Sequence, residues 1–186
     1  MKNYLIIGGS SGIGKALVTM LDNENNRVFA TYNTHPLASE NQKTSYHFLN
    51  VRDANVNVDF LPETLDGFVY CPGSINLAPF ARIKPADFAE DFDLQVNGAI
   101  RVLQAVLPKL KASGNASIVF FSTVAVQNGF NFHSQVAASK GAIEGLTRAL
   151  AAEFAPSIRV NAIAPSLTDT PLAEKLLNKP EKKEAN

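Results

Sequence analysis

The sequence has one cysteine, Cys71, and no tryptophan among its 186 residues. A single thiol cannot form an internal disulfide framework, nor a zinc site built from several cysteines. The three histidines, His35, His47 and His133, are scattered along the chain without the spacing of metal ligands. We therefore expect neither disulfides nor a metal site.

The sequence also has no excess of charge, because 17 Lys and Arg residues balance 17 Asp and Glu residues. Such a chain lacks the positive field that attracts nucleic acid or an anionic membrane. No apolar run approaches the ~18 residues that a membrane-spanning helix needs. The apolar start at residues 4–7 is too short for a secretory signal peptide. We expect a cytoplasmic protein that binds neither nucleic acid nor membranes.

Hydrophobic residues make up 46% of the chain, enough for one domain with a buried core, here taken as residues 1–186. Helical spacing of apolar residues predicts a helix from Ile13, a second over 94–110 and a third over 134–154. Short apolar runs predict strands at 4–7, 27–32, 46–51, 67–71, 117–122 and 158–164. The polar segment 53–66 predicts a connection with little or no helix, and the charged tail 174–186 predicts a solvated helix or a frayed end.

This alternation of strands and helices predicts an α/β fold, with a parallel sheet that carries helices on both faces. Its first strand leads into a glycine-rich stretch, Gly8-Gly9-Ser10-Ser11-Gly12-Ile13-Gly14. Glycines between a strand and a helix permit a tight turn and a close approach of the backbone to a pyrophosphate. The helix that follows offers free N–H groups to the same anion. The sequence therefore predicts a dinucleotide site at this loop.

The glycine spacing, G-x-x-x-G-x-G, resembles that of the short-chain dehydrogenase/reductase family. The resemblance continues in four more segments: Gln95-Val96-Asn97, Ser122-Thr123-Val124-Ala125, Ala137-Ala138-Ser139-Lys140-Gly141-Ala142 and Ile158-Arg159-Val160-Asn161-Ala162-Ile163-Ala164-Pro165. It implies a doubly wound, Rossmann-like sheet and an NAD(P)-dependent oxidoreductase that transfers a hydride between the cofactor and a carbonyl or alcohol. Family members commonly pair through the helices here predicted at 94–110 and 134–154, which implies a homodimer or homotetramer.

The resemblance also implies catalytic positions. Lys140 corresponds to the lysine that binds the nicotinamide ribose, and Asn97 to the asparagine that holds a relay water. Thr123 stands where the family has a serine that hydrogen-bonds the substrate oxygen, and it keeps the hydroxyl. Its neighbour Ser122 is expected to point to the opposite face of the strand.

The main departure is Val136, which occupies the position of the tyrosine that protonates the substrate oxygen. Related enoyl reductases place that tyrosine seven residues before the lysine, which is His133 here. Residues seven apart share a helix face, and histidine titrates near neutral pH, so His133 is one candidate acid. The alternative is that His133 lies in the loop before the helix, with Ser134 as the helix cap.

For the cofactor, the absence of an acidic residue between the second strand and Glu40 favours NADP over NAD, although no lysine or arginine lies there either. Thr31, Asn33, Thr34 and His35 are left to hydrogen-bond the phosphate. Cys71 is interpreted as a packed residue rather than a nucleophile. The cofactor contacts that the resemblance implies are Gly8, Ser10, Ser11, Gly12, Ile13, Gly14, Asn33, Asn50, Val51, Gly73, Lys140, Pro165, Thr168 and Thr170.

Family members continue beyond the position of Thr170 with a flap, a further helix and a last strand. The sequence ends at Asn186, so we expect a domain without that helix and strand. Three functions stay open. The first is the oxidoreductase, with a small carbonyl or alcohol as substrate. The second, motivated by Val136, is a cofactor-binding sensor or regulatory subunit without this catalysis. The third is a structural subunit of an oligomer.

Overall fold

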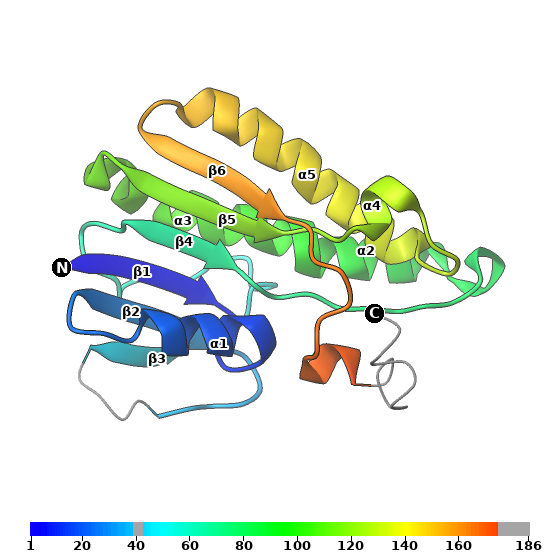
Figure 1. Cartoon of the computed structure of the whole chain (residues 1–186), viewed down its shortest axis with the longest axis horizontal. Coiled ribbons are helices and arrows are strands. Elements are labelled where there is room, and N and C mark those ends of the chain that lie inside the picture. Colours follow the sequence, from blue (N-terminus) through cyan, green and yellow to red (C-terminus); the bar gives the residue numbers. More distant parts are fainter. Residues whose placement is uncertain (39–42, 175–186) are drawn as a thin grey trace.

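The computed structural model describes residues 1–38 and 43–174. Within them, six strands form one sheet with the order β3-β2-β1-β4-β5-β6 (Figure 1). Every neighbouring pair of strands is parallel. The strands are β1 (Lys2–Ile7), β2 (Asn26–Tyr32), β3 (Thr44–Phe48), β4 (Gly67–Tyr70), β5 (Ala116–Phe121) and β6 (Ile158–Ile163). The predicted doubly wound parallel sheet is confirmed.

The sheet carries helices α1 (Gly12–Leu21), α2 (Pro85–Phe92), α3 (Gly98–Ser113), α4 (Ala125–Asn128) and α5 (Ser134–Phe154). Short 3₁₀ turns lie at Phe80–Arg82 and Pro171–Ala173. The helix predicted at 94–110 is instead a five-residue π-helical segment, Asp93–Asn97, followed by α3. The prediction for α5 was right at both ends. The segment 53–66 contains no helix, as predicted. The tail 174–186, predicted to be a solvated helix or a frayed end, lies outside the described residues except for Glu174.

Sequence reasoning missed α2, which carries its own start signals. Pro85 is its first residue, and the carboxylate of Asp87 accepts a 2.9 Å hydrogen bond from the backbone N–H of Lys84. Proline at the first helical position and an acid two residues later are typical of a helix start. This short helix leads directly into the π-helical segment, and both turn out to carry residues of the site.

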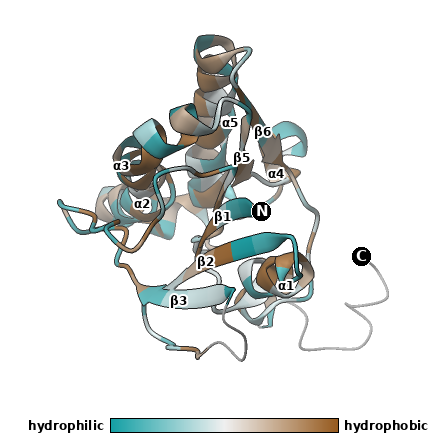
Figure 2. Cartoon of the chain, turned by 90° about the vertical axis from the view of Figure 1, so that its left-hand side faces the viewer, coloured by the Kyte–Doolittle hydropathy of each residue, from teal (hydrophilic) through white to brown (hydrophobic). Residues whose placement is uncertain are grey.

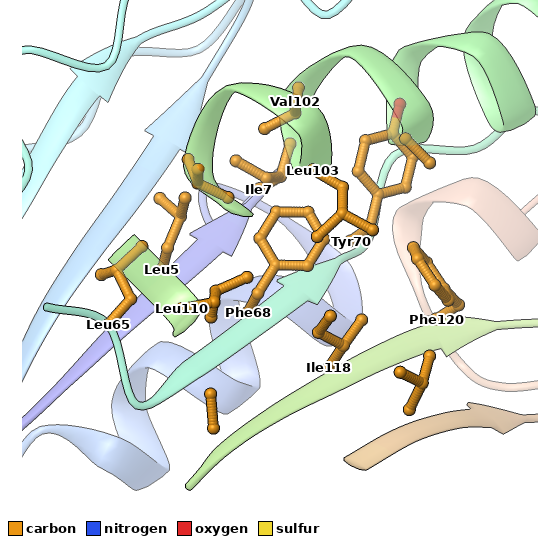
Figure 3. Close-up of a cluster of buried hydrophobic side chains, with 14 of the residues drawn as sticks. Leu5, Ile7, Leu65, Phe68, Tyr70, Val102, Leu103, Leu110, Ile118 and Phe120 are labelled. Carbon is orange, nitrogen blue, oxygen red and sulfur yellow. The ribbon is translucent and has the colours of Figure 1, made fainter. Parts of the chain in front are cut away.

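The core lies on both faces of the sheet because side chains alternate along each strand. On one face, strand residues meet α3 in a large cluster that includes Leu5, Ile7, Phe68, Tyr70, Val102, Leu103, Leu110, Ile118 and Phe120 (Figure 3). On the other face, Val18 of α1 packs in a smaller cluster with Ile6, Val28, Ala30 and Val69. Figure 2 shows α1 and α3 on opposite sides of the sheet. None of the helices in the described part of the chain is long and apolar enough to cross a membrane.

The strand order reverses between β1 and β4, since the chain winds outward from β1 to β3 and then returns to β4 on the opposite side. At such a switch point the connections leave in opposite directions, and a crevice opens beyond the carboxyl ends of the strands. The glycine loop after β1 and the segment Cys71–Gly73 after β4 lie at this place. The fold therefore positions the predicted dinucleotide loop at the crevice.

Candidate cofactor and substrate site

A cavity of about 640 Å³ lies at the carboxyl ends of β1 to β4. It brings together most of the cofactor contacts that the sequence predicted: Gly8, Ser10, Ser11, Gly12, Ile13, Gly14, Asn33, Asn50, Val51, Gly73 and Thr170. No Asp or Glu of the described chain lines this cavity, and Arg52 adds a cation that sequence reasoning missed. The cavity is therefore suited to an anionic ligand.

Two hydrogen bonds to Thr31 of β2 fix the glycine loop beside this cavity. The N–H of Gly8 donates to the hydroxyl of Thr31 at 3.1 Å, and the N–H of Gly9 donates to the carbonyl of Thr31 at 2.9 Å. A Cβ built on Gly14 would lie only 2.2 Å from the carbonyl oxygen of Gly8, so the turn requires glycine there. Helix α1 starts with no side-chain cap, which leaves its first N–H groups free for phosphate oxygens.

The part of the cavity lined by Asn50 and Val51 differs in detail from the sequence prediction. Strand β3 ends at Phe48, so Asn50 and Val51 lie in a turn rather than in the strand. The Asn50 amide donates to the carboxylate of Asp53 at 2.7 Å and accepts from the N–H of Arg52 at 3.1 Å. These bonds fix the turn. They also occupy part of the hydrogen-bonding capacity of the Asn50 side chain, which was predicted to contact the cofactor.

A second cavity, of about 520 Å³, lies beyond the ends of β4 to β6 and is bounded by the start of α5 and by the segment 165–173. Its apolar lining includes Ile75, Leu77, Phe121, Val124, Phe130, Val136, Leu167 and Ala173. Pro165 and Thr168, predicted as cofactor contacts, line this cavity and not the first. The residues Ile13, Cys71, Gly73, Thr170 and Leu172 line both cavities, so the two are joined.

Lys140 faces the second cavity from α5. Burial lowers the pKa of its ammonium group to about 8, an effect that the nearby Asp91 and Cys71 partly oppose. Its Nζ lies 3.7 Å from the position that a Cβ on Gly73 would take. The ammonium makes none of the described hydrogen bonds or ion pairs. Within the described chain, Lys140 is therefore a donor without a hydrogen-bond or ion-pair partner, at the junction of the two cavities.

The structure places Gln95, and not the predicted Asn97, in the lining of the second cavity. Asn97 lines neither cavity, and its amide lies 3.4 Å from the carboxylate of Asp93. Gln95 is 1% exposed and lines the second cavity. The π-helical segment decides this outcome, since its wider turns change which side chain faces the cavity. The residue of this motif that lines the cavity therefore lies two positions before Asn97.

The orientation of the Gln95 amide is fixed by its neighbours. Its Nε2 donates to both carboxylate oxygens of Asp91 at 2.8 Å, so Oε1 points the other way. This Oε1 is buried and has no partner in the described chain, and it lies 3.3 Å from the position of a Cβ on Gly73. An unpartnered acceptor and the unpartnered ammonium of Lys140 thus lie beside the same glycine.

Asp91, at 4% exposed, accepts hydrogen bonds from three side chains. Besides Gln95, the hydroxyl of Ser139 donates to Oδ2 at 2.5 Å, and the hydroxyl of Ser74 makes a short bond to Oδ1. These residues come from α2, the π-helical segment, α5 and the loop after β4. Asp91 was missed together with α2. The three donors hold this carboxylate in one place.

Thr123 and Ser122 both line the second cavity, so the expectation that Ser122 points away is wrong. Strand β5 ends at Phe121, and the alternation of faces ends with it. The Ser122 hydroxyl donates to the carboxylate of Glu144 at 2.6 Å. The Thr123 oxygen accepts a 3.3 Å bond from the N–H of Ala125, which leaves its own proton free for a ligand. Thr123 is the better placed hydroxyl donor.

His133 precedes α5, as the alternative interpretation held, yet it still lines the second cavity. Its Nδ1 lies 2.8 Å from the carbonyl oxygen of Asn131, which can only accept, so Nδ1 carries a proton. In the neutral ring, Nε2 is then an acceptor. Ser134 is not the helix cap: it is the first helical residue, and its hydroxyl is buried without a partner in the described chain.

Val136 and Cys71 also lie at the second cavity, and neither offers an acid or a nucleophile. Val136 is 6% exposed and lines the second cavity, so an apolar side chain stands at the position of the family's tyrosine. Burial raises the pKa of the Cys71 thiol to about 12, which matches a packed residue and not a nucleophile. Among residues 1–38 and 43–174, no group of three or more His, Cys, Asp and Glu residues is arranged to hold a metal ion.

The comparisons with known proteins agree with this geometry. A family model described as "short chain dehydrogenase" matches residues 2–181. The chain is 33% identical to 3-oxoacyl-[acyl-carrier-protein] reductase of Thermotoga maritima over 197 residues, which cover 96% of this chain and 78% of that protein. It is 44% identical over 100 residues to a tropinone reductase homolog of Datura stramonium, covering 51% of this chain and 37% of that protein.

Solved structures give the same result. One, described as a short chain dehydrogenase/reductase family protein, superposes with a TM-score of 0.87 at 28% identity, over 96% of this chain and 79% of that one. Another, described as a putative betaketoacyl-ACP reductase, superposes with a TM-score of 0.82, also at 28% identity, over 96% of this chain and 78% of that one.

Proposed function

The chain belongs to the short-chain dehydrogenase family, and we propose that it is an NAD(P)-dependent oxidoreductase acting on a carbonyl or alcohol. The observation that carries the proposal is the junction of the two cavities. There the ammonium of Lys140 and the Oε1 of Gln95, a donor and an acceptor without described partners, flank Gly73. A ligand that spans both cavities satisfies both groups.

The residues present fit a nicotinamide dinucleotide. The first cavity offers the glycine loop, the free N–H groups of α1 and a lining without carboxylates for the pyrophosphate. Lys140 is placed to donate to hydroxyls of the nicotinamide ribose. When bound, the nicotinamide supplies or accepts the hydride. Thr123 orients the substrate oxygen by a hydrogen bond, and the apolar second cavity excludes water from the reacting carbon.

We also propose NADP as the preferred cofactor. Asn33, Thr34 and His35 line the first cavity just after β2, and none of them carries a negative charge that repels a 2′-phosphate. An acid at this place typically binds the ribose hydroxyls of NAD. The homo-oligomer, the cytoplasmic location and the single domain over residues 1–186 stay predictions from the sequence.

Val136 favours a second candidate function, a cofactor-binding sensor or regulatory subunit. An apolar side chain at the tyrosine position removes the family's proton donor without disturbing the first cavity. This protein would bind the cofactor and turn over no carbonyl. The candidate acid that the sequence suggested, His133, is still available to the enzyme, because it lines the second cavity beside Val136.

The test is the oxidation of NADPH, and separately of NADH, in the presence of a panel of apolar ketones and aldehydes. The oxidoreductase predicts turnover that Lys140→Met abolishes. The control Lys2→Met, at the amino end of β1 away from both cavities, keeps turnover. Cofactor binding without turnover on the whole panel supports the sensor and contradicts the enzyme. If the protein neither binds cofactor nor turns over a carbonyl, the remaining function is that of a structural subunit.

A further inference from the structure

The second cavity raises the question of which group protonates the substrate oxygen. Among the described residues that line it, the ionisable side chains are those of Cys71, His133 and Lys140. The Cys71 thiol, with its pKa raised to about 12, is too weak an acid. The one described hydrogen bond of the His133 ring joins Nδ1 to the carbonyl of Asn131, a residue that does not line the cavity. Lys140 brings an ammonium group without a described partner to the cavity, and the test below separates it from His133.

The helix geometry places Lys140 where the missing tyrosine leaves space. Residues four apart lie on one face of an α-helix, one turn from each other, and Val136 and Lys140 have this spacing in α5. Both line the second cavity, and valine is much shorter than tyrosine. No phenol separates the substrate from the ammonium, whose protons have no described partner.

A buried carboxylate stands behind this lysine. Asp91 is close enough to raise the pKa of Lys140, although it makes no described ion pair with it. The donors from Ser74, Gln95 and Ser139 hold Asp91 in one place. Ser139 precedes Lys140 in the chain, so this network also fixes the turn of α5 from which the lysine projects.

We propose that the Lys140 ammonium itself donates the proton to the substrate oxygen, and that Asp91 is a positioning residue that keeps this ammonium charged beside Gly73. The proposal rests on the oxidoreductase function. As the carbonyl carbon gains the hydride, its oxygen gains the electron pair of the C=O π bond. A proton passes from Nζ to that oxygen, which leaves an alcohol and a neutral amine. The amine regains a proton from solvent.

Four charged or titratable groups near Lys140 could influence its proton: those of Asp91, Cys71, His133 and Glu144. Asp91 faces it from α2 and Cys71 from the end of β4, and both favour the charged ammonium. His133 lines the same cavity from the residue before α5. Glu144, one turn after Lys140 in α5, is bonded to Ser122 and Gln127. Of these groups, Asp91 is the carboxylate that raises the pKa of Lys140.

The first experiment needs neither cofactor nor turnover. The side-chain NMR signal of Lys140, identified by its loss in Lys140→Met, is titrated in the wild-type protein and in Asp91→Asn. We expect a wild-type pKa near 8 and a value lower by about one pH unit in Asp91→Asn, because the ammonium loses its carboxylate. If Asp91→Asn fails to fold, the wild-type titration decides. An ordinary lysine pKa, or one that Asp91→Asn leaves unmoved, overturns the role of Asp91.

The second experiment is the pH profile of kcat/KM for ketone reduction. If Lys140 is the acid, the rate falls above a midpoint near 8, and Asp91→Asn moves that midpoint to lower pH. Lys140→Arg keeps the positive charge but cannot give up a proton, so turnover falls at least ~100-fold while cofactor still binds. Retained turnover in Lys140→Arg contradicts the proposal, as does a profile whose limb disappears in His133→Asn. Absence of turnover in the wild type would contradict the oxidoreductase function instead. The NMR titration would still decide whether Asp91 raises the pKa of Lys140.

Discussion

At the scale of single residues, most buried polar groups of the described structure have hydrogen-bond partners, and a few have none. The phenol of Tyr70 belongs to the groups with a partner. It is 3% exposed and donates to the carbonyl of Leu94, in the π-helical segment, at 2.6 Å. Lys140 and Gln95 have groups without a described partner, and they lie together. The proposed function rests on this contrast.

The Tyr70 bond gives a direct prediction about stability. Tyr70→Phe leaves the Leu94 carbonyl without this donor, so we expect the free energy of unfolding to fall by about 1–2 kcal/mol. The matched control is Tyr4→Phe, since the Tyr4 hydroxyl has no described hydrogen bond and the change should cost less. Urea unfolding of both variants checks the difference. Equal stabilities would show that the bond contributes nothing.

Lys140 predicts how stability depends on pH. Its pKa of about 8 lies below the ordinary value of 10.5. Between these values the unfolded chain binds a proton that the folded one lacks, so the free energy of unfolding rises with pH in that window. Lys140→Met removes this contribution. The free energy of unfolding of the wild type minus that of Lys140→Met should therefore be constant below pH 8 and rise above it. Parallel stability curves up to pH 10 would rule out the depressed pKa.

At the scale of elements, the π-helical segment depends on a close approach between Tyr70 and Gly98. A Cβ on Gly98 would lie 2.5 Å from the Tyr70 oxygen, so one of the two must move. We expect Gly98→Ala to lower the free energy of unfolding by roughly 1–3 kcal/mol. Because Gln95 lies in the same segment, cofactor binding should weaken as well.

A second glycine provides the control for this prediction. Gly145→Ala, in α5, places its Cβ where no atom lies within 4 Å. Alanine is favoured over glycine in a helix interior by up to ~1 kcal/mol, so this variant should be slightly more stable than the wild type. Thermal or urea unfolding compares the two. A Gly98→Ala variant as stable as Gly145→Ala would contradict the packing described for the segment.

The elements also show how far sequence reasoning reaches. The strands follow from short apolar runs, and α5 from its long helical periodicity, because those patterns report burial on a sheet or a helix face. The π-helical segment follows no 3.6-residue pattern, so the sequence did not predict that Gln95, and not Asn97, lines the second cavity. Helix α2 and Asp91 were missed because eight residues are too few to show a helical period over the window of about 11–18 residues that such a pattern needs. Tertiary contacts that join four segments around Asp91 leave no local signal.

At the scale of the whole molecule, the two joined cavities predict cofactor preference. Asn33→Asp adds a negative charge to the lining of the first cavity just after β2. We expect NADPH to bind about tenfold more weakly or worse, a change of ~1.4 kcal/mol, while NADH binds as before or more tightly.

The control for this preference carries the same charge elsewhere. Asn25→Asp lies on an exposed residue before β2, at the opposite end of that strand from the cavity, and should change neither affinity. Titration of each variant with both cofactors gives the four dissociation constants to compare. Equal weakening of NADPH binding by both variants would mean that net charge, and not the position of residue 33, determines the effect.

The proposed oxidoreductase depends on the first cavity being a working dinucleotide site. The most direct measurement is a titration of the wild-type protein with NADPH and with NADH, followed by cofactor fluorescence, which no tryptophan obscures. We predict saturable binding of both, tighter for NADPH. The same ligand at ~100 times its dissociation constant should raise the free energy of unfolding by ~2.7 kcal/mol. A folded protein that binds neither cofactor would contradict the account.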